Sequence, residues 1–163
     1  MPESKAPLNV TVRRATAADV DDLIPLYCGF MEHEGDIPPP PAELRRRLER
    51  LLGCETDDVL IACSEDGTPL GYLQQRYFLS VWRADHDAFI EDVFVVEAAR
   101  GRRVGERLLE LAFALARERG VHRICLDTNE NNHRGRALYE RTGFKNLMPQ
   151  WDNGREIFYS KYF

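Results

Sequence analysis

The feature that most constrains the fold is an apolar strand, an arginine-rich turn, a long helix and a second strand in succession. Residues 89–96 have the composition of a strand, residues 100–105 (RGRRVG) that of a turn, and residues 124–128 that of a second strand. Apolar residues recur at helical spacing between the turn and Gly120, a typical residue for ending a helix. Two neighbouring strands joined by a helix run parallel. The sequence therefore predicts a parallel βαβ unit.

The segments around this unit predict an α/β (α+β) fold, with a mixed, mostly antiparallel central sheet flanked by helices. The expected elements are a strand ending near residue 14, a helix up to 34, a second helix marked by Leu44, Leu48, Leu51 and Leu52, a hairpin of 59–63 and 70–81, a short helix at 134–141 and a last strand at 157–162. Thr16 and Asp19 have the spacing of a capping box, and Pro25 is expected to kink or break the first helix. We expect one domain over residues 1–163, a length that can close a single core.

Composition narrows the class of partner. A net charge of −5 argues against a nucleic-acid surface, and no apolar run is long enough to cross a membrane or act as a signal peptide. The four cysteines and four histidines show no metal-ligand spacing, so no metal is expected. We interpret Cys28, Cys54, Cys63 and Cys125 as reduced thiols, which predicts a cytoplasmic protein.

The turn at Arg100–Gly105 is a candidate anion site. A helix start exposes about four unpaired N–H groups and a partial positive charge. Three arginines add formal charge there, and the glycines would let a phosphate approach closely. A solvated turn before a helix can have the same residues, so this segment alone leaves both interpretations open. The spacings of a dinucleotide-binding loop and of a Walker-type P-loop are absent.

A second segment gives the turn its context. Residues 132–144 (NHRGRALYERTGF) resemble the N-x-x-A-x-x-L-Y-x-x-x-G-F pattern of the GNAT superfamily of N-acetyltransferases, whose R-G-x-G-x-G signature resembles the turn at 100–105. Residues 12–19 resemble the start of the same family. The resemblance implies a GNAT-like fold, acetyl-CoA as co-substrate, and these cofactor-binding residues: Val93, Phe94, Val95, Arg100, Gly101, Arg102, Arg103, Val104, Gly105 and Asn132.

Two residues depart from the family pattern. Arg103 stands where the family has a glycine, and Gly135 where it has an alanine. Because only a position with positive φ would strictly need glycine, we expect the backbone of Arg103 to present its N–H to a pyrophosphate in the usual way. Its side chain is free on this interpretation to fold over the phosphates.

Acetyl transfer needs a group that takes a proton from the amine and one that protonates the leaving thiolate. Glu91, in the strand that leads to the turn, is our candidate base, with a salt-bridging strand residue as the alternative. Strand alternation predicts that Asp92 points to the opposite face, as a structural residue or an amine contact, unless a bulge changes the faces. The resemblance implies that Tyr139 is the acid; simple packing of a helix tyrosine is the alternative.

The acceptor is predicted to be a primary amine. Residues 78–82 (FLSVW) and 90–95 (IEDVFV) are similar to segments of diamine acetyltransferases, which suggests a small cationic amine and makes Trp82 and Asp92 candidate substrate contacts. An aminoglycoside, an amino acid and a peptide amine are the alternatives. A non-catalytic acyl-CoA-binding module is the rival from another class. A homodimer, paired through an exposed strand near Ile157, is a further expectation.

Overall fold

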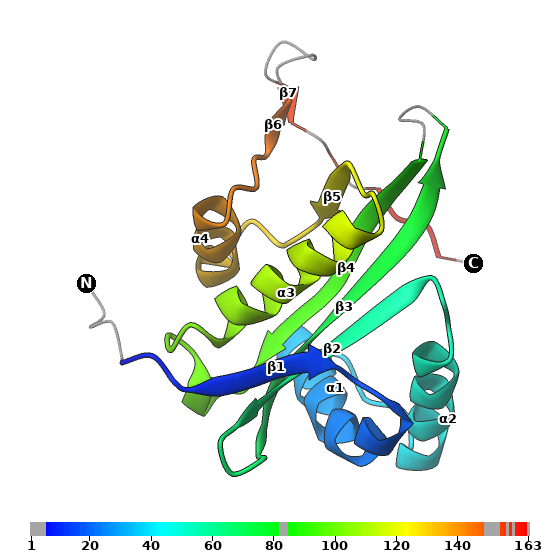
Figure 1. Ribbon diagram of the computed structural model, residues 1–163, viewed down its shortest axis with the longest axis vertical. Helices are drawn as coiled ribbons and strands as arrows, with labels where there is room; N and C mark the ends of the chain where they lie inside the picture. Colours follow the sequence, from blue (N-terminus) through cyan, green and yellow to red (C-terminus); the bar gives the residue numbers. More distant parts are fainter. Residues whose placement is uncertain (1–5, 82–84, 149–153, 156, 158, 163) are drawn as a thin grey trace. The chain divides into compact units, whose positions relative to one another are not determined.

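The computed structural model describes residues 6–81, 85–148, 154–155, 157 and 159–162 (Figure 1). Its main sheet has the order β1-β2-β3-β4-β5, formed by Val10–Arg14, Asp57–Ser64, Pro69–Ser80, Asp85–Val95 and Arg123–Leu126. The first four strands pair antiparallel, and β5 pairs parallel with β4. The predicted mixed sheet and its parallel βαβ unit are confirmed.

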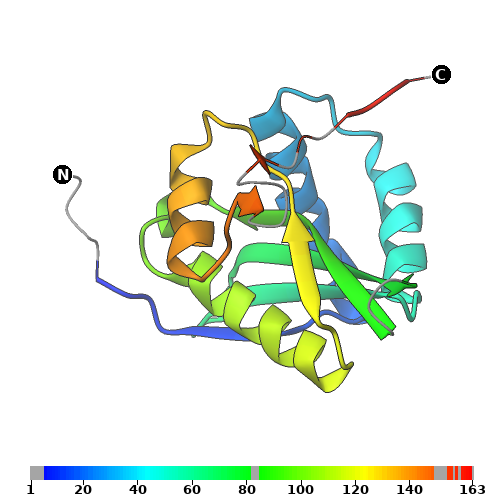
Figure 2. The same ribbon diagram turned by 90° about the horizontal axis from the view of Figure 1, so that it is seen from above.

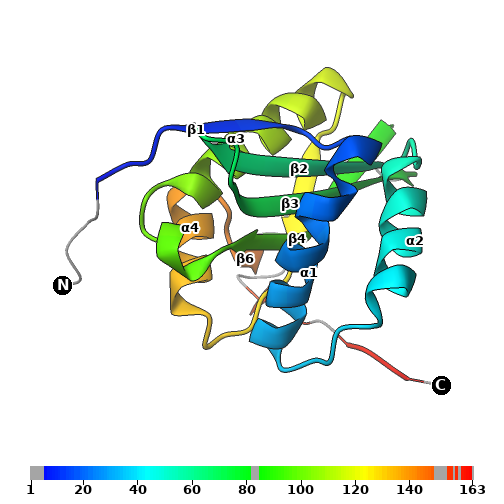
Figure 3. The ribbon, with the colours of Figure 1, turned by 90° about the horizontal axis from the view of Figure 1, so that it is seen from below.

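Helices cover both faces of this sheet. Helices α1 (Val20–Glu34) and α2 (Pro41–Leu52) lie on one face and α3 (Val104–Glu118) on the other (Figures 2 and 3). This two-sided cover explains why five consecutive residues of β2, Asp58–Ala62, are buried, where a half-exposed strand would alternate. The leucines predicted for the second helix supply its buried contacts, Leu44 and Leu48.

Helix α1 is continuous through Pro25, so the expected break does not occur. Proline removes one backbone donor, but Leu23, Leu26 and Tyr27 on either side of it are buried in the core against the sheet. Tertiary packing of an apolar face supplies most of a helix's stability, and here it holds the helix together across the proline.

The capping box before α1 is present and is reinforced by an arginine. Thr16 donates its backbone N–H to the Asp19 carboxylate at 2.7 Å, and the Arg13 guanidinium donates to both carboxylate oxygens at 2.8 and 2.6 Å. The Arg13 hydrogen bonds, helped by those from Thr16, hold the pKa of this carboxyl well below its usual range although burial opposes the shift. The ionised form of Asp19 therefore stabilises the folded chain.

We expect Asp19→Asn to lower the free energy of unfolding at pH 7 by about 2 kcal/mol, a typical value for hydrogen bonds to a charged group. Because the folded pKa lies below the unfolded one, this contribution is present above about pH 4 and is lost as the pH falls further. Urea titrations at several pH values measure the difference. Asp21→Asn is the control, since Asp21 is exposed and pairs with Arg45 at the surface. A difference that persists unchanged at pH 3 would contradict the assignment.

The contacts of the chain divide it into two compact units, Met1–Leu126 and Asp127–Phe163. The second unit contains α4 (His133–Arg141) and a small antiparallel pair of β6 (Leu147–Met148) and β7 (Gly154–Arg155). The short helix is thus confirmed. The single domain over residues 1–163 stays a prediction.

The strand predicted at 157–162 is wrong for the residues described there. Residues 157 and 159–162 lie in no strand, and Ile157 and Tyr162 are 68% and 92% exposed. Alternating apolar residues give a segment strand propensity, but a strand also needs a partner and a surface to pack on. The paired strand near Ile157 that we expected to support a homodimer is therefore not formed.

Candidate functional site

A β-bulge interrupts the pairing of β3 with β4 at Glu91. Gln74 pairs with Asp92 and the next residue, Gln75, pairs with Ile90, so Glu91 is the extra residue of β4. A bulge of this kind leaves one residue without a ladder partner and re-aims the side chains around it. The proposed base thus occupies the one irregular position of the β3–β4 ladder.

The bulge brings Glu91 and Asp92 to the same face of the sheet. Glu91 contacts Arg76 at 2.9 Å, and Asp92 accepts a hydrogen bond from the Tyr72 hydroxyl at 3.2 Å. Tyr72 and Arg76 are four residues apart on β3 and therefore share a face, the face that α1 and α2 cover. The expectation that Asp92 points away from Glu91 is wrong, because the extra residue breaks the alternation on which it rests.

A chain of polar contacts runs across this face from α1 to Glu91. The Tyr27 hydroxyl donates to Gln74 at 3.1 Å, and the Gln74 amide donates to Asp57 at 3.3 Å. Arg76 then bridges Asp57, at 3.4 Å, and Glu91. Tyr27, Gln74 and the Asp57 side chain are at least nine-tenths buried, whereas Glu91 is 31% exposed. The network is anchored in the core and opens to solvent at the bulge.

Two stacked tyrosines line the buried end of this network. The rings of Tyr27 and Tyr72 lie 4.0 Å apart at 22°. Burial, followed by the nearby Asp92 carboxylate, raises the pKa of both hydroxyls, so both stay protonated hydrogen-bond donors. Sequence reasoning missed these residues; the signal available was the polar run Gln74-Gln75-Arg76 inside an otherwise apolar strand.

The pairing of β4 with β5 ends next to the bulge. The ladder with β5 spans Asp87–Ile90 and ends there. Within the described residues, β4 from Asp92 to Val95 pairs with β3 but not with β5, so the two strands separate beyond Ile90. The side chain of Phe94 packs in the core against Phe30 and Tyr72, so at this residue only the backbone could contact a ligand.

The arginine-rich turn lies directly between β4 and α3. Gly101 has φ +75°, and α3 begins at Val104, so the backbone of Arg102–Gly105 supplies the exposed N–H groups of a helix start. The backbone oxygen of Arg102 accepts from the Leu8 N–H at 3.2 Å, which ties the turn to the segment before β1. A helix start of this kind can bind an anion through its N–H groups, so the turn remains the candidate anion site.

Arg103 adopts φ +66° and is, among the residues the structure describes, the only non-glycine with positive φ. The assumption behind our expectation, that φ is not positive at this position, is therefore wrong: Arg103 lies in the left-handed region, where a side chain costs about 1–2 kcal/mol. The guanidinium donates to both carboxylate oxygens of Glu106, at 3.1 and 2.9 Å. It therefore packs against α3 in this structure.

The other two arginines of the turn donate hydrogen bonds to backbone carbonyl groups. Arg100 donates to the Val95 carbonyl at 2.8 Å and lies 5.7 Å from the centre of the Phe94 ring. Arg102 donates to the Ala6 carbonyl at 3.1 Å. These hydrogen bonds fix the conformation of the turn. Because the two guanidinium groups already have partners, an anion placed there would be bound mainly by main-chain N–H groups.

In the second unit, Asn132 caps α4 as predicted, since its side-chain oxygen accepts the Gly135 N–H at 2.9 Å. A Cβ at Gly135 would lie 2.4 Å from the Asn132 amide nitrogen, so an alanine here would require the Asn132 side chain to shift. Tyr139 is half-buried, and its ring meets that of Phe144 edge-on at 5.9 Å. The ring is thus held by packing.

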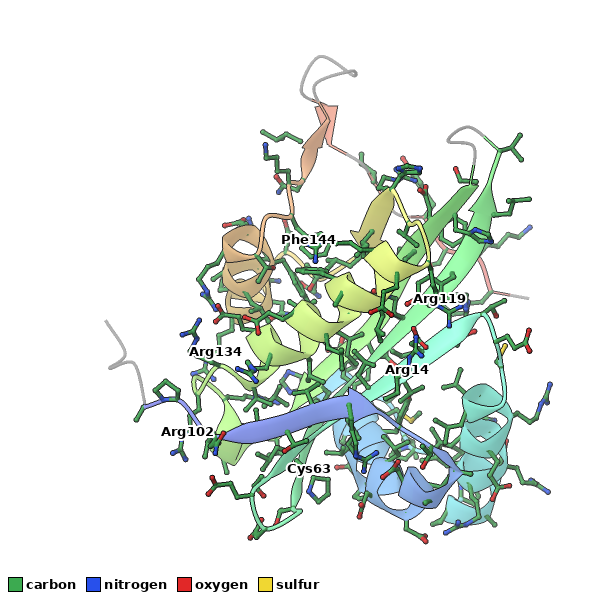
Figure 4. All side chains as sticks on the ribbon, viewed as in Figure 1. Arg14, Cys63, Arg102, Arg119, Arg134 and Phe144 are labelled. Atoms are coloured by element: carbon green, nitrogen blue, oxygen red, sulfur yellow. The ribbon has the colours of Figure 1, made fainter. Side chains whose placement is uncertain are left out.

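The remaining substrate candidate, Trp82, lies outside the described residues. A hollow of about 170 Å³ elsewhere in the first unit is lined by Arg14, Asp58 and Arg119 among others (Figure 4). Both arginines contact Asp58, at 3.1 and 3.4 Å, and Tyr77 donates to it at 2.6 Å. Because both oxygens of the buried Asp58 carboxylate already have partners, we interpret the ion cluster that lines this hollow as structural.

The described residues contain no group of three or more His, Cys, Asp or Glu side chains placed to hold a metal ion. No helix in the described part of the chain combines the length and apolar character needed to span a membrane.

Comparison with known proteins gives a consistent result. The model of the acetyltransferase (GNAT) family matches residues 20–144. An uncharacterized N-acetyltransferase of Bacillus subtilis, YhfO, is 29% identical over 139 residues, which cover 83% of this chain and 90% of that protein. The aminoglycoside N(6')-acetyltransferase type 1 of Stenotrophomonas maltophilia is 26% identical over 138 residues, or 83% and 86% of the two chains.

A crystal structure from Arthrobacter sp. FB24, described as that of an acetyltransferase, has a TM-score of 0.83 and 28% identity, covering 99% of this chain and 100% of that one. The likeness extends over the whole mixed sheet and its helices, and it confirms the fold class predicted from the sequence.

Proposed function

Because the chain belongs to the acetyltransferase (GNAT) family, and is thus an acetyl-CoA-dependent acyltransferase, we propose that it transfers the acetyl group to a primary amine by direct attack. In this proposal Glu91 takes the proton of the amine, directly or through water, and Tyr139 protonates the departing thiolate. The nitrogen forms a bond to the acetyl carbon, the carbon–sulfur bond breaks, and the sulfur leaves with the electron pair and accepts the phenol proton.

The observation that carries the proposal is the bulge at Glu91. It presents two carboxylates, Glu91 and Asp92, on one face of β4 at the point where the ladder with β5 ends. An amine held by these carboxylates would lie beside the part of β4 that extends past its ladder with β5, and we propose that the amide-bearing arm of the coenzyme binds along this part of the strand. Base and thioester would then meet at one point of the strand.

The proposed cofactor site continues from that edge into the turn. Val93–Val95 would bind through their backbone, and the N–H groups from Gly101 to Gly105 would surround the pyrophosphate. The hydrogen bonds of Arg100 and Arg102 fix the backbone of this turn, which supports the proposal. Asn132 of the second unit is included as a cofactor contact on the family resemblance.

The acceptor proposed is a small cationic amine. Among the described residues, the carboxylates of Asp57, Glu91 and Asp92 lie on the same face of the sheet, and Arg76 contacts two of them, Asp57 and Glu91. A surplus of negative charge favours a cationic ligand. Aminoglycosides are cationic too, and the relative from Stenotrophomonas is named for this class of compound.

The free thiols found for all four cysteines support a cytoplasmic location.

Thiol release from acetyl-CoA against a panel of amines tests the proposal. We expect the rate to rise from neutral primary amines to diamines and aminoglycosides, with N-acetyl products identified by mass spectrometry. Tight binding of acetyl-CoA with no release above the hydrolysis background for any amine would favour the rival, a non-catalytic acyl-CoA-binding module.

Arg103 gives a prediction on the cofactor turn. We expect Arg103→Gly to change the free energy of unfolding by less than about 1 kcal/mol, because relief of the left-handed side chain offsets the added chain entropy of glycine. Since the backbone would bind the phosphates, the Kd for acetyl-CoA should stay within about fivefold, whereas β-branched Val at this position should destabilise the fold. Thermal melts and calorimetry measure both effects. A loss of affinity beyond fiftyfold in Arg103→Gly would show that the guanidinium itself binds the phosphates.

A further inference from the structure

The side chain of Glu91 is held by an ion pair, although its backbone has no partner in the β3–β4 ladder. As the extra residue of the bulge it has no partner in the β3–β4 ladder. A bulged residue keeps more conformational freedom than a paired one, yet a proton acceptor must be oriented to work. The contact that orients the Glu91 carboxylate is the 2.9 Å ion pair with Arg76.

Arg76 can perform this task because it is itself anchored. Its Nε lies 3.4 Å from the carboxylate of Asp57, which is 5% exposed and also accepts from Gln74. Gln74 in turn accepts from Tyr27 of α1. A fork-shaped guanidinium with one nitrogen on a buried acid and another on Glu91 has little freedom to swing. The orientation of Glu91 is thus linked to the packed core of the first unit.

The same ion pair affects the acceptor. Arg76 is 51% exposed, so a cationic amine that approaches Glu91 from solvent meets a guanidinium that already occupies one carboxylate oxygen. The arriving ammonium and Arg76 carry the same charge and compete for the same group. Arg76 therefore makes binding of a cationic acceptor weaker while it keeps the base in place.

We propose that Arg76 is a positioning residue for Glu91. Arg76 orients the Glu91 carboxylate, and by the same contact it lowers the affinity of the site for cationic acceptors. The inference rests on the proposed function. It predicts opposite effects of one substitution: Arg76→Gln should lower kcat by about tenfold through loss of orientation, and should lower the acceptor KM by about threefold through loss of competition. The KM for acetyl-CoA should not change.

A double-mutant cycle tests whether Arg76 acts through Glu91. Arg76→Gln should lower kcat in the wild type and have no further effect when Glu91→Gln is present. Arg76→Lys keeps the charge and should retain the wild-type acceptor KM with part of kcat. Arg47→Gln is the matched control, because Arg47 is an exposed arginine paired with a glutamate on the outside of α2. An equal loss of kcat in both backgrounds, or an unchanged kcat, would overturn the proposal.

A binding measurement separates this inference from the proposed function. Calorimetry with 1,4-diaminobutane should give a Kd about threefold lower for Arg76→Gln than for the wild type, and no such gain in the Glu91→Gln background. Protein that binds the diamine in this way but transfers no acetyl group would contradict the proposed function alone. A diamine affinity that is unchanged or reduced in Arg76→Gln would contradict the role of Arg76.

Discussion

Replacing Glu91 with glutamine is expected to lower kcat about a hundredfold, the usual scale for loss of a general base. The amide keeps the size of the side chain but cannot take a proton from the amine. The loss should be largest at low pH, where more of the acceptor carries a proton that must be removed before attack. At high pH the free amine is already abundant, and the variant should approach the wild type. Initial rates of thiol release between pH 6 and 9 measure this profile.

Two controls accompany Glu91→Gln. Glu110→Gln removes a glutamate that also pairs with an arginine, Arg107 at 3.7 Å, but on the exposed surface of α3, and it should leave kcat unchanged. Thermal melts of both variants show whether loss of the Arg76 contact has altered the fold. If Glu91→Gln keeps the wild-type rate over the whole pH range, Glu91 is not the base and its ion pair is structural.

Replacing Tyr139 with phenylalanine is expected to reduce kcat by about ten- to a thousandfold, with the Kd for acetyl-CoA within about twofold of the wild type. Phenylalanine keeps the edge-on contact with Phe144, so the packing of α4 should survive. Only the hydroxyl that would donate to the thiolate is removed. Single-turnover rates and calorimetry separate these two quantities.

The matched control for Tyr139→Phe is Tyr159→Phe. Tyr159 belongs to the same unit and is 84% exposed, so loss of its hydroxyl should have no effect on the rate. A wild-type kcat for Tyr139→Phe would assign protonation of the thiolate to water and leave Tyr139 as a packing residue. A Kd for acetyl-CoA raised far above twofold would instead make the hydroxyl a cofactor contact.

Much of the fold could be predicted from local sequence. The parallel βαβ unit followed from apolar periodicity and from Gly120, which has φ +71° just after α3. The cap at Asn132 and the hairpin of β2 and β3 followed from residues adjacent in the chain. The strand at 157–162 was predicted wrongly because its alternation carries no information on a partner strand.

The candidate site was predictable in its residues but not in its geometry. Glu91 and Asp92 were identified as candidates, and their separation onto opposite faces was the natural expectation from a regular strand. Whether β4 is regular at Glu91 depends on how it pairs with Gln74 and Gln75 of β3, which are not its neighbours along the chain. The bulge therefore belongs to tertiary pairing.

Sequence alone determined the family resemblance, the order of the elements up to α4, the glycines and arginines of the turn at 100–105, and the cap at Asn132, because each of these rests on neighbours in the chain. Tertiary structure alone decided that Glu91 is the bulged residue, that Arg76 links it to Asp57, and that Arg103 takes a left-handed conformation. These three facts depend on contacts or backbone angles imposed by the packed sheet and α3, and no short-range pattern of residue types encodes them.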